Sequence, residues 1–256
     1  NAQAPDAECG GRKTGTIGDI GVFSFNRHKV MQSGEGGVLV TDNEDLMTKA
    51  ALVRNHGECV VEGLGVQDIV NTVGLNYRMT EMEAAVAREQ FRKMPPLVSR
   101  RQQLAARLSD GIAGLEGITP PAVSEDCTHS FYMYVMKIDE ELIGIDRKLF
   151  TDAVAAEGVM LRGGFLKPIY LEPLFQQKIC FGPNGHPFTA NPRSDQLDYH
   201  KGLCPTCEEL EYKSLMLTAV MQPPQTETDM DNFVEACRKV LANRDELRRY
   251  HNSLTD

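Results

Sequence analysis

The sequence predicts a mixed α/β fold. Within its first 54 residues, a short apolar run, a glycine-rich turn, a second apolar run and a helical pattern follow one another. The same alternation of apolar runs and helical patterns restarts beyond residue 130. Strands that alternate with amphipathic helices are typical of layered α/β proteins. Apolar residues make up 41% of the chain and charged residues 25%, which suits a protein that folds around a core.

Length and charge narrow the possible functions. The chain has 256 residues and a formal net charge of -9, and broad nucleic-acid binding needs the opposite, basic balance. Membrane helices need about 20 consecutive apolar residues, which the sequence does not contain. No basic region followed by a hydrophobic segment marks a signal peptide. We therefore expect a protein that works in the cytoplasm, without nucleic-acid or membrane partners.

The cysteines indicate reduced thiols rather than a disulfide framework. There are seven of them, an odd number, and their spacing is irregular. Cys204 and Cys207 have the C-x-x-C spacing of zinc and redox motifs. A structural zinc site needs about four ligands, and His200 is the only further candidate nearby. Structural thiols are the favoured interpretation, and a zinc or redox module is the alternative.

The first elements are two strands and a helix. Residues 17–25 and 37–41 are short, apolar and bounded by glycines, which predicts a buried strand followed by a second strand. A helix should then run towards Arg54, with Asn43 as its N-cap.

A long helical segment follows. Thr80 and Glu83 have capping-box spacing, and a stripe of apolar residues comes behind them at helical spacing. Pro95 and Pro96 should break or kink this helix, so that residues 97–115 form a second one. The apolar stripe consists of Ala84, Ala87, Phe91 and Met94. We expect this interrupted segment to connect two domains.

The second half of the chain repeats the α/β pattern. Residues 130–138 predict a strand, 146–157 a helix and 159–162 a further strand. Residues 176–202 are polar, contain Gly and Pro, and predict an irregular loop of the kind that often serves a function.

The chain ends in a helix that Thr228 could cap. Its basic end, with Arg244, Arg248 and Arg249, would suit the C-terminal dipole of that helix and predicts a solvated face. The expected buried face consists of Met230, Phe233, Cys237, Val240 and Leu241.

Ser24 and Lys29 are the residues that suggest chemistry. They lie at the end of the first predicted strand and on the loop that leaves it. A serine hydroxyl there can donate to a phosphate oxygen, and an amine five residues later can react with an aldehyde on the same ligand. The glycines that follow lack the spacing of a P-loop or a dinucleotide-binding motif. For Gly34, Gly36 and Gly37 we therefore expect a turn in which positive φ angles are needed.

Around these residues the sequence resembles a known family. The run GTIGDIGVFSFNRHKVMQSGEGGVLVTDNEDL is similar to the active-site segment of the pyridoxal-phosphate-dependent sugar aminotransferases of the DegT/StrS group. The resemblance continues at 54–57, at 74–81 with Ala84 and Ala85, and at Cys204 and Pro205 with Glu208. That last match accounts for the C-x-x-C spacing without a metal. The first hundred residues resemble the family well and the remainder only thinly.

The resemblance implies a fold of the aspartate-aminotransferase type. Such a fold combines a three-layer large domain with a small α+β C-terminal domain, of which this chain would be the C-terminal portion. Residues 1–100 would be the later part of the cofactor-binding domain, and residues 101–256 the connecting helix and the small domain.

The resemblance also implies the site residues. Lys29 would hold pyridoxal 5′-phosphate as a Schiff base, and Ser24 would hydrogen-bond its phosphate. Gln3 would lie beside the cofactor ring, and Asn76 would reach the phosphate bound by the neighbouring subunit of a homodimer. The alternatives are a strand-end amide for Gln3 and a turn-forming residue for Asn76.

Two details of the resemblance affect the function. Relatives that remove a hydroxyl carry histidine in place of the lysine, and counting from Ser24 gives that position to Lys29 rather than His28. The acidic residue that pairs with the pyridine nitrogen would fall immediately before Asn1, and family members are longer at that end. We expect the 256 residues alone to bind the cofactor poorly.

The function implied is amino transfer from glutamate or glutamine to a keto sugar, which in this family is usually nucleotide-linked. Lys29 would serve as general base and acid during the transfer. The alternatives are a sugar dehydratase of the same family and a non-catalytic fragment or homologue that acts as a binding partner.

Overall fold

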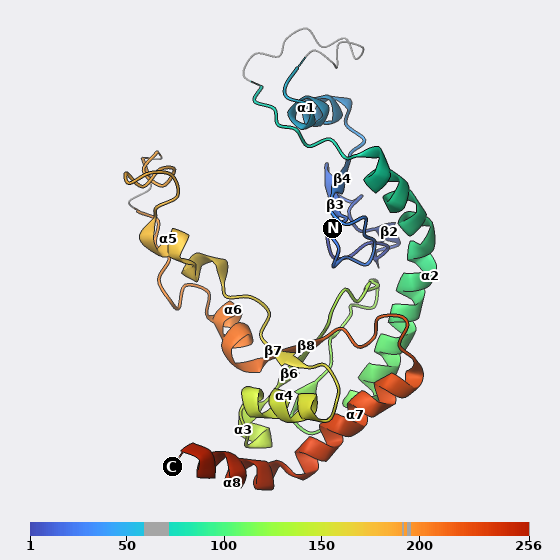
Figure 1. Ribbon diagram of the computed structural model, residues 1–256, viewed down its shortest axis with the longest axis vertical. Helices are drawn as coiled ribbons and strands as arrows, with labels where there is room; N and C mark the ends of the chain where they lie inside the picture. Colours follow the sequence, from blue (N-terminus) through green and yellow to red (C-terminus); the bar gives the residue numbers. More distant parts are fainter. Residues whose placement is uncertain (59–71, 191, 194–195, 256) are drawn as a thin grey trace. The chain divides into compact units, whose positions relative to one another are not determined.

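The computed structural model describes residues 1–58, 72–190, 192–193 and 196–255, and its elements are shown in Figure 1. Cys59 lies outside the described residues, and the other six cysteines are free. The chain divides into two units. Unit 1 comprises residues 1–103 and 122–132, and unit 2 comprises residues 104–121 and 133–256. The assignment of residues 1–100 and 101–256 to a large and a small domain stays a prediction.

Unit 1 contains two antiparallel strand pairs. The short strands β1 (Glu8–Cys9) and β2 (Arg12–Lys13) form the first pair. Strands β3 (Gly21–Ser24) and β4 (Gly37–Val40) form the second, in which Ser24 lies opposite Gly37. The loop between β3 and β4 carries Lys29.

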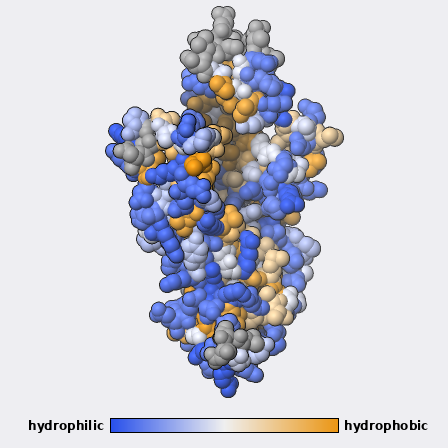
Figure 2. Space-filling view, turned by 60° about the vertical axis from the view of Figure 1, so that its left-hand side comes forward, coloured by the Kyte–Doolittle hydropathy of each residue, from blue (hydrophilic) through white to orange (hydrophobic). Residues whose placement is uncertain are grey.

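The burial predicted for residues 17–25 is wrong. The strand covers only Gly21–Ser24, and β4 is its one partner among the described residues. Val22 is 52% exposed and Leu39 on β4 is 41% exposed. The sequence shows that these residues are apolar. Burying them needs a second layer of structure, and no part of the described chain covers this side of the β3–β4 pair. Figure 2 shows hydrophobic residues, in orange, that reach the surface among hydrophilic ones.

Local capping chemistry starts the helices of unit 1 as predicted. Helix α1 (Glu44–Arg54) begins after Asn43, whose side chain accepts a hydrogen bond from the backbone N–H of Leu46. Helix α2 (Glu81–Ile112) begins with the predicted capping box, in which the backbone N–H of Thr80 and that of Glu83 each donate to the other residue's side chain.

The prediction that Pro95 and Pro96 end a helix is wrong. Both lie inside the single helix α2, so residues 97–115 do not form a separate helix. Each proline removes one backbone donor, but Met94 and Val98 on either side are buried, at 7% and 1% exposure. Burial of these neighbours offsets the lost hydrogen bonds. In the predicted apolar stripe, Phe91 is 60% exposed and does not belong to the core.

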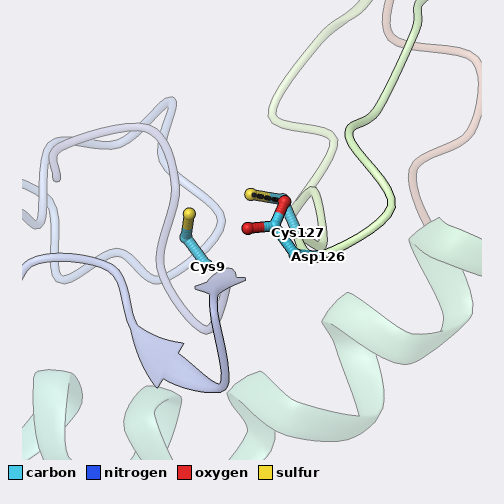
Figure 3. Close-up of side chains that lie close together, drawn as sticks. All are labelled: Cys9, Asp126 and Cys127. Atoms are coloured by element: carbon cyan, nitrogen blue, oxygen red, sulfur yellow. Dashed lines mark hydrogen bonds between the residues drawn. The ribbon is translucent and has the colours of Figure 1, made fainter.

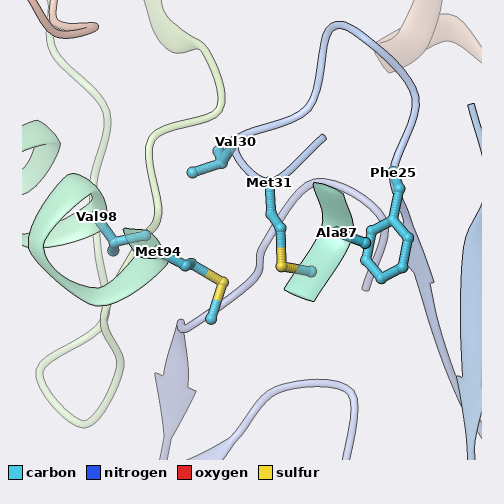
Figure 4. Packing of buried hydrophobic residues seen from close by; sticks show 6 residues of the cluster. All are labelled: Phe25, Val30, Met31, Ala87, Met94 and Val98. Atoms are coloured by element: carbon cyan, nitrogen blue, oxygen red, sulfur yellow. The ribbon is translucent and has the colours of Figure 1, made fainter. Parts of the chain in front are cut away.

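The core of unit 1 joins the Lys29 loop to α2. Phe25, Val30 and Met31 from the loop contact one side of the helix, as Figure 4 shows. The helix contributes Ala87, Met94 and Val98 to this cluster. The loop is therefore held by apolar contacts on both sides of Lys29.

Unit 2 is built on a four-stranded antiparallel sheet with the order β5-β6-β8-β7. The central strand β6 alternates buried and exposed residues, so one face points to the core. It is shorter than the predicted strand 130–138, and β7 begins only at the end of the predicted strand 159–162. The strands are β5 (Ile118–Thr119), β6 (Tyr134–Ile138), β7 (Arg162–Gly163) and β8 (Leu215–Thr218).

Helices and an irregular loop complete unit 2. Helix α4 matches the prediction for 146–157, with Asp146 as its N-cap. The described residues between 178 and 202 form turns, as predicted for 176–202. The shorter elements are α3 (Glu140–Ile143), α4 (Arg147–Ala156), a 3₁₀ turn (Ile169–Leu171), α5 (Pro173–Gln177), α6 (Pro205–Glu209) and a π-helical turn (Leu210–Ser214).

The C-terminal prediction needs two corrections. Thr226, not Thr228, caps helix α7 (Glu227–Ala242), because Thr226 and Asp229 form a capping box. The basic residues Arg244 and Arg248 belong to a separate helix, α8 (Arg244–Thr255). The predicted buried face of α7 is otherwise confirmed for Met230, Phe233, Cys237 and Val240. None of the helices in the described part of the chain is both long and apolar enough to cross a membrane.

Candidate functional site

The candidate site is the loop between β3 and β4. Its two ends are tied together by backbone hydrogen bonds, because the N–H of Phe25 donates to the carbonyl of Gly36 and the N–H of Ser33 donates to the carbonyl of Phe25. The N–H of Lys29 donates to the carbonyl of Asn26 and closes a turn at the tip. The backbone that carries Lys29 is thus fixed by local bonds.

Two glycines give the loop its shape, as predicted. Gly34 and Gly36 have φ angles of +97° and +121°, which side chains other than glycine rarely adopt. A Cβ atom on Gly36 would also lie 2.6 Å from the terminal carbon of Met79. Gly37 is needed for another reason, since a Cβ there would lie 2.7 Å from the carbonyl oxygen of Phe23.

Lys29 is half-buried, and its amine has an aromatic neighbour. Its Nζ lies over the ring of Tyr132, 5.0 Å from the ring centroid. Val30, which follows it, is buried, whereas His28, which precedes it, is exposed. A cation over an aromatic face is held electrostatically, so Tyr132 restricts where the amine can lie.

Tyr132 is the residue that sequence reasoning missed. It lies 103 positions after Lys29, and no local motif marks it. Its segment is held by α2: the buried Arg101 donates to the carbonyl of Phe131 at 2.9 Å, and Gln102 donates to the carbonyl of His129. Its only signal in the sequence is an aromatic residue at the start of a predicted strand.

Ser24 is half-buried at the end of β3, and its hydroxyl oxygen accepts a hydrogen bond from the N–H of Asn26 at 3.4 Å. The side-chain amide of Asn26 donates to Glu35 across the loop at 2.8 Å. The hydroxyl hydrogen of Ser24 therefore stays available to a ligand. Ser24 and Lys29 thus lie on one short, braced loop.

Gln3 and Asn76 are placed elsewhere in unit 1. Gln3 is exposed in the first turn of the chain. Asn76 is exposed and forms an isolated antiparallel bridge with Asn55, next to the end of α1. In the residues that the structure describes, neither side chain has a hydrogen bond or ion pair with Lys29 or Ser24. Their assignment to the site stays a prediction.

The segment around Glu208 has a structural arrangement of its own in unit 2. The carboxylate of Glu208 accepts hydrogen bonds from the hydroxyl of Tyr170 and the N–H of Gly202. Burial, together with Glu208, raises the pKa of Tyr170 to about 12, and the Tyr170 hydroxyl lowers the pKa of Glu208. Cys204 and Cys207 are exposed beside it, and no third metal-ligating side chain joins them in the described ranges.

Comparison with known proteins identifies the family. The model of the DegT/DnrJ/EryC1/StrS aminotransferase family matches residues 1–203. The chain belongs to this family. Its members are pyridoxal-phosphate-dependent aminotransferases, and the resemblance found in the Lys29 segment is thereby confirmed.

The relatives show how much of a family member the chain represents. It is 30% identical over 258 residues to an L-glutamine:2-deoxy-scyllo-inosose aminotransferase of Streptoalloteichus tenebrarius, and covers 59% of that protein. It superposes on the aminotransferase of Psychrobacter cryohalolentis with a TM-score of 0.76 and 27% identity, covering 94% of this chain and 60% of that one. A putative sugar aminotransferase of Streptococcus pneumoniae, solved in its PLP form, matches with a TM-score of 0.69 and 21% identity, covering 95% of this chain and 57% of that one.

These matches confirm the mixed α/β fold of the DegT-family aminotransferases over about 56–60% of their chains. The chain spans slightly less than three fifths of the length of the curated relatives it matches.

The side chains of the loop fit part of a pyridoxal-phosphate site. Lys29 offers an amine that is half-buried and held over a ring, which is the group that reacts with an aldehyde. Ser24 offers a hydroxyl donor, and Arg27 and His28 next to Lys29 make the loop tip basic. These groups suit a ligand that carries both an aldehyde and a phosphate.

Proposed function

We propose that the protein containing this chain transfers an amino group from glutamate or glutamine to a keto sugar, with Lys29 as the reacting residue. The observation that carries the proposal is the position of the Lys29 amine, half-buried on a braced loop five residues after Ser24 and over the ring of Tyr132. Membership of an aminotransferase family supports it. The relatives named for glutamine-dependent transfer to a scyllo-inosose support a keto-sugar or keto-cyclitol acceptor.

Four residues have a task in this proposal. Lys29 is the covalent attachment point for pyridoxal 5′-phosphate, and Ser24 donates a hydrogen bond to a phosphate oxygen. Gln3 lies beside the cofactor ring, and Asn76 reaches the site of a partner subunit in a homodimer. The bound cofactor supplies the electron sink that lets a proton leave the α-carbon of the donor.

Lys29 also moves protons. With the cofactor bound, the Lys29 amine would take the proton from the α-carbon of the donor, and the protonated amine would deliver a proton to the sugar carbon that receives nitrogen. The ring of Tyr132 limits the positions open to the Lys29 amine, which favours these transfers by orientation.

Borohydride reduction tests the attachment point. The full-length protein is incubated with pyridoxal 5′-phosphate, reduced and digested with trypsin. Because trypsin does not cleave after a modified lysine, reaction at Lys29 should yield one adduct-bearing peptide that spans residues 28–49. A Lys29→Arg variant should lose the adduct, and a Lys49→Arg variant, changed at an exposed lysine of α1, should keep it. An adduct on another lysine, or none, contradicts the proposal.

Product analysis separates amino transfer from dehydration. With glutamine and a nucleotide-linked keto sugar, the proposal expects a product that has gained nitrogen and kept all its hydroxyl groups. The position of Lys29 rather than His28 five residues after Ser24 favours this outcome. A deoxygenated product would assign the protein to the dehydratases. Full-length protein that develops no visible absorbance band with the cofactor would instead indicate a non-catalytic homologue.

A further inference from the structure

A pair of cysteines in unit 1 lies outside the Lys29 loop and has no part in the proposed reaction. Cys9 ends strand β1, and Cys127 lies on the segment 122–132 of the same unit. The two residues form an isolated antiparallel bridge although 118 positions separate them. Figure 3 shows their sulfur atoms turned towards one another, with the carboxylate of Asp126 beside them.

The hydrogen bonds around the bridge define its geometry. The N–H of Gly10 donates to the carbonyl of Asp126, and the N–H of Thr128 donates to the carbonyl of Glu8, each at 2.9 Å. These bonds flank Cys9 and Cys127 without involving either residue, which makes the two cysteines a non-hydrogen-bonded antiparallel pair. Residues paired in this way have Cα atoms about 4.5 Å apart, at the short end of the range that disulfides span.

The positions of the two cysteine side chains, like the backbone geometry, suit a disulfide. The two sulfur atoms and a carboxylate oxygen of Asp126 all lie within 4.8 Å of one another. Both cysteines are partly accessible, so a small thiol reagent can reach them. A disulfide would need the two sulfur atoms to approach to about 2.05 Å.

We propose that Cys9 and Cys127 are a redox-active pair that closes to a cross-strand disulfide. Oxidised glutathione is a sufficient oxidant. The Cys9 thiolate attacks one of its sulfur atoms and releases one glutathione. Cys127 then attacks the Cys9 sulfur of the mixed disulfide and releases the second. Two protein thiols lose two electrons in total, and the two protons end on the two glutathione thiols.

The bond would join two segments that both serve the candidate site. Cys9 follows the N-terminal turn that carries Gln3, and Cys127 lies five residues before Tyr132, whose ring contacts the Lys29 amine. A further contact already holds these segments together, since the hydroxyl of Ser130 donates to the carbonyl of Pro5 at 2.6 Å. The disulfide would fix the same junction covalently, and the inference stands whether or not Lys29 is catalytic.

A metal ion on the same side chains is the competing explanation, and the chemistry favours the disulfide. Cys9, Asp126 and Cys127 offer three ligands where a structural zinc site uses about four. Three side chains fall short of that number, whereas a disulfide needs only the two paired thiols.

Peptide mapping tests the pair directly. The reduced full-length protein is equilibrated with oxidised glutathione, free thiols are alkylated, and the protein is digested with trypsin. The expected product links the peptide that ends at Arg12 and contains Cys9 to peptide 108–137, which contains Cys127. A reductant should separate them. Replacing Cys204 and Cys207 together by serine should leave the link intact, whereas Cys9→Ser should reduce it to background.

Two further measurements decide between the explanations. Closing a loop this long should raise the melting temperature of the wild type by about 5 °C or more, with no such difference between oxidised and reduced Cys9→Ser. Asp126→Asn should leave the cross-link unchanged. The proposal is overturned if the wild-type peptide that ends at Arg12 and peptide 108–137 remain unlinked, or if the protein takes up zinc at one equivalent and loses it in Asp126→Asn.

Discussion

At the scale of single residues, Lys29 is defined by its neighbours rather than by its own position in the sequence. Tyr132 contacts its amine, and Val30 and Met31 bury the backbone that follows it. Gly36 makes the loop possible, because its φ of +121° is one that side chains other than glycine rarely adopt. The position of the Lys29 amine and the glycine turn therefore depend on the same loop.

Gly36→Ala should destabilise the fold and loosen the Lys29 loop. The strained φ angle should lower the free energy of unfolding by about 1–3 kcal/mol, because the terminal carbon of Met79 can move aside. Urea denaturation of the variant measures this change. Gly18→Ala is the matched control, because that glycine has no positive φ and no atom within 4 Å of an added Cβ. Equal effects of the two substitutions would show that the conformation of Gly36 is not required.

At the scale of elements, short-range chemistry was predictable and long-range packing was not. The caps formed by Asn43 and Thr80 were predicted correctly, since a cap depends on residues two or three positions apart. The prolines of α2 misled the prediction, because the burial of Met94 and Val98 decides whether the helix continues. The cap of α7 was misplaced by two residues, because Thr226 and Thr228 are chemically alike and only the spacing to Asp229 distinguishes them.

Thr226→Ala should destabilise helix α7, and Thr228→Ala should not. Thr226 accepts the N–H of Asp229 in a capping box, and its loss should lower the free energy of unfolding by about 1 kcal/mol. Thr228 is exposed inside the helix, where alanine is at least as favourable. Urea denaturation of both variants at neutral pH is the measurement. A larger loss of stability in Thr228→Ala than in Thr226→Ala would support Thr228 as the cap, as the sequence predicted.

The pH dependence of stability gives a second test of the Thr226–Asp229 capping box. Hydrogen bonds from the backbone and hydroxyl of Thr226 lower the pKa of Asp229. A carboxyl group whose folded pKa is lowered stabilises the protein above its unfolded pKa, and this stabilisation is lost as the pH falls through the folded pKa. The difference in the free energy of unfolding between the wild type and Thr226→Ala should therefore become smaller at acidic pH. A difference that stays constant down to strongly acidic pH would contradict a role for the Asp229 carboxylate.

At the scale of the whole molecule, the chain forms two units and spans only part of the length of its relatives. Apolar side chains on β3 and β4 are exposed, and Asn76 on the described chain is exposed and forms a bridge with Asn55. In the proposed homodimer, Asn76 acts on the site of the partner subunit.

Subunit complementation tests the shared site. Lys29→Ala and Asn76→Ala should each abolish or strongly reduce amino transfer in the full-length protein. In a mixed dimer, one site receives both substitutions and the other receives neither. Unfolding and refolding an equal mixture should therefore restore about a quarter of the wild-type activity if subunits pair at random. Each variant refolded alone is the control. A mixture as inactive as its components would place Asn76 at its own subunit's site, or at none.

The sequence by itself determined the family, the caps of α1 and α2, and the glycine turn of the loop that carries Lys29. These depend on residues that are close along the chain, where the step from Ser24 to Lys29 and the glycines around Glu35 carry the information. Tertiary structure alone decided that Tyr132 contacts Lys29, that α2 continues through two prolines, and that Cys9 faces Cys127. Each of these features depends on contacts between residues that are far apart in the sequence or on burial by such residues. The free energy of these contacts depends on tertiary packing, which a local sequence pattern does not show.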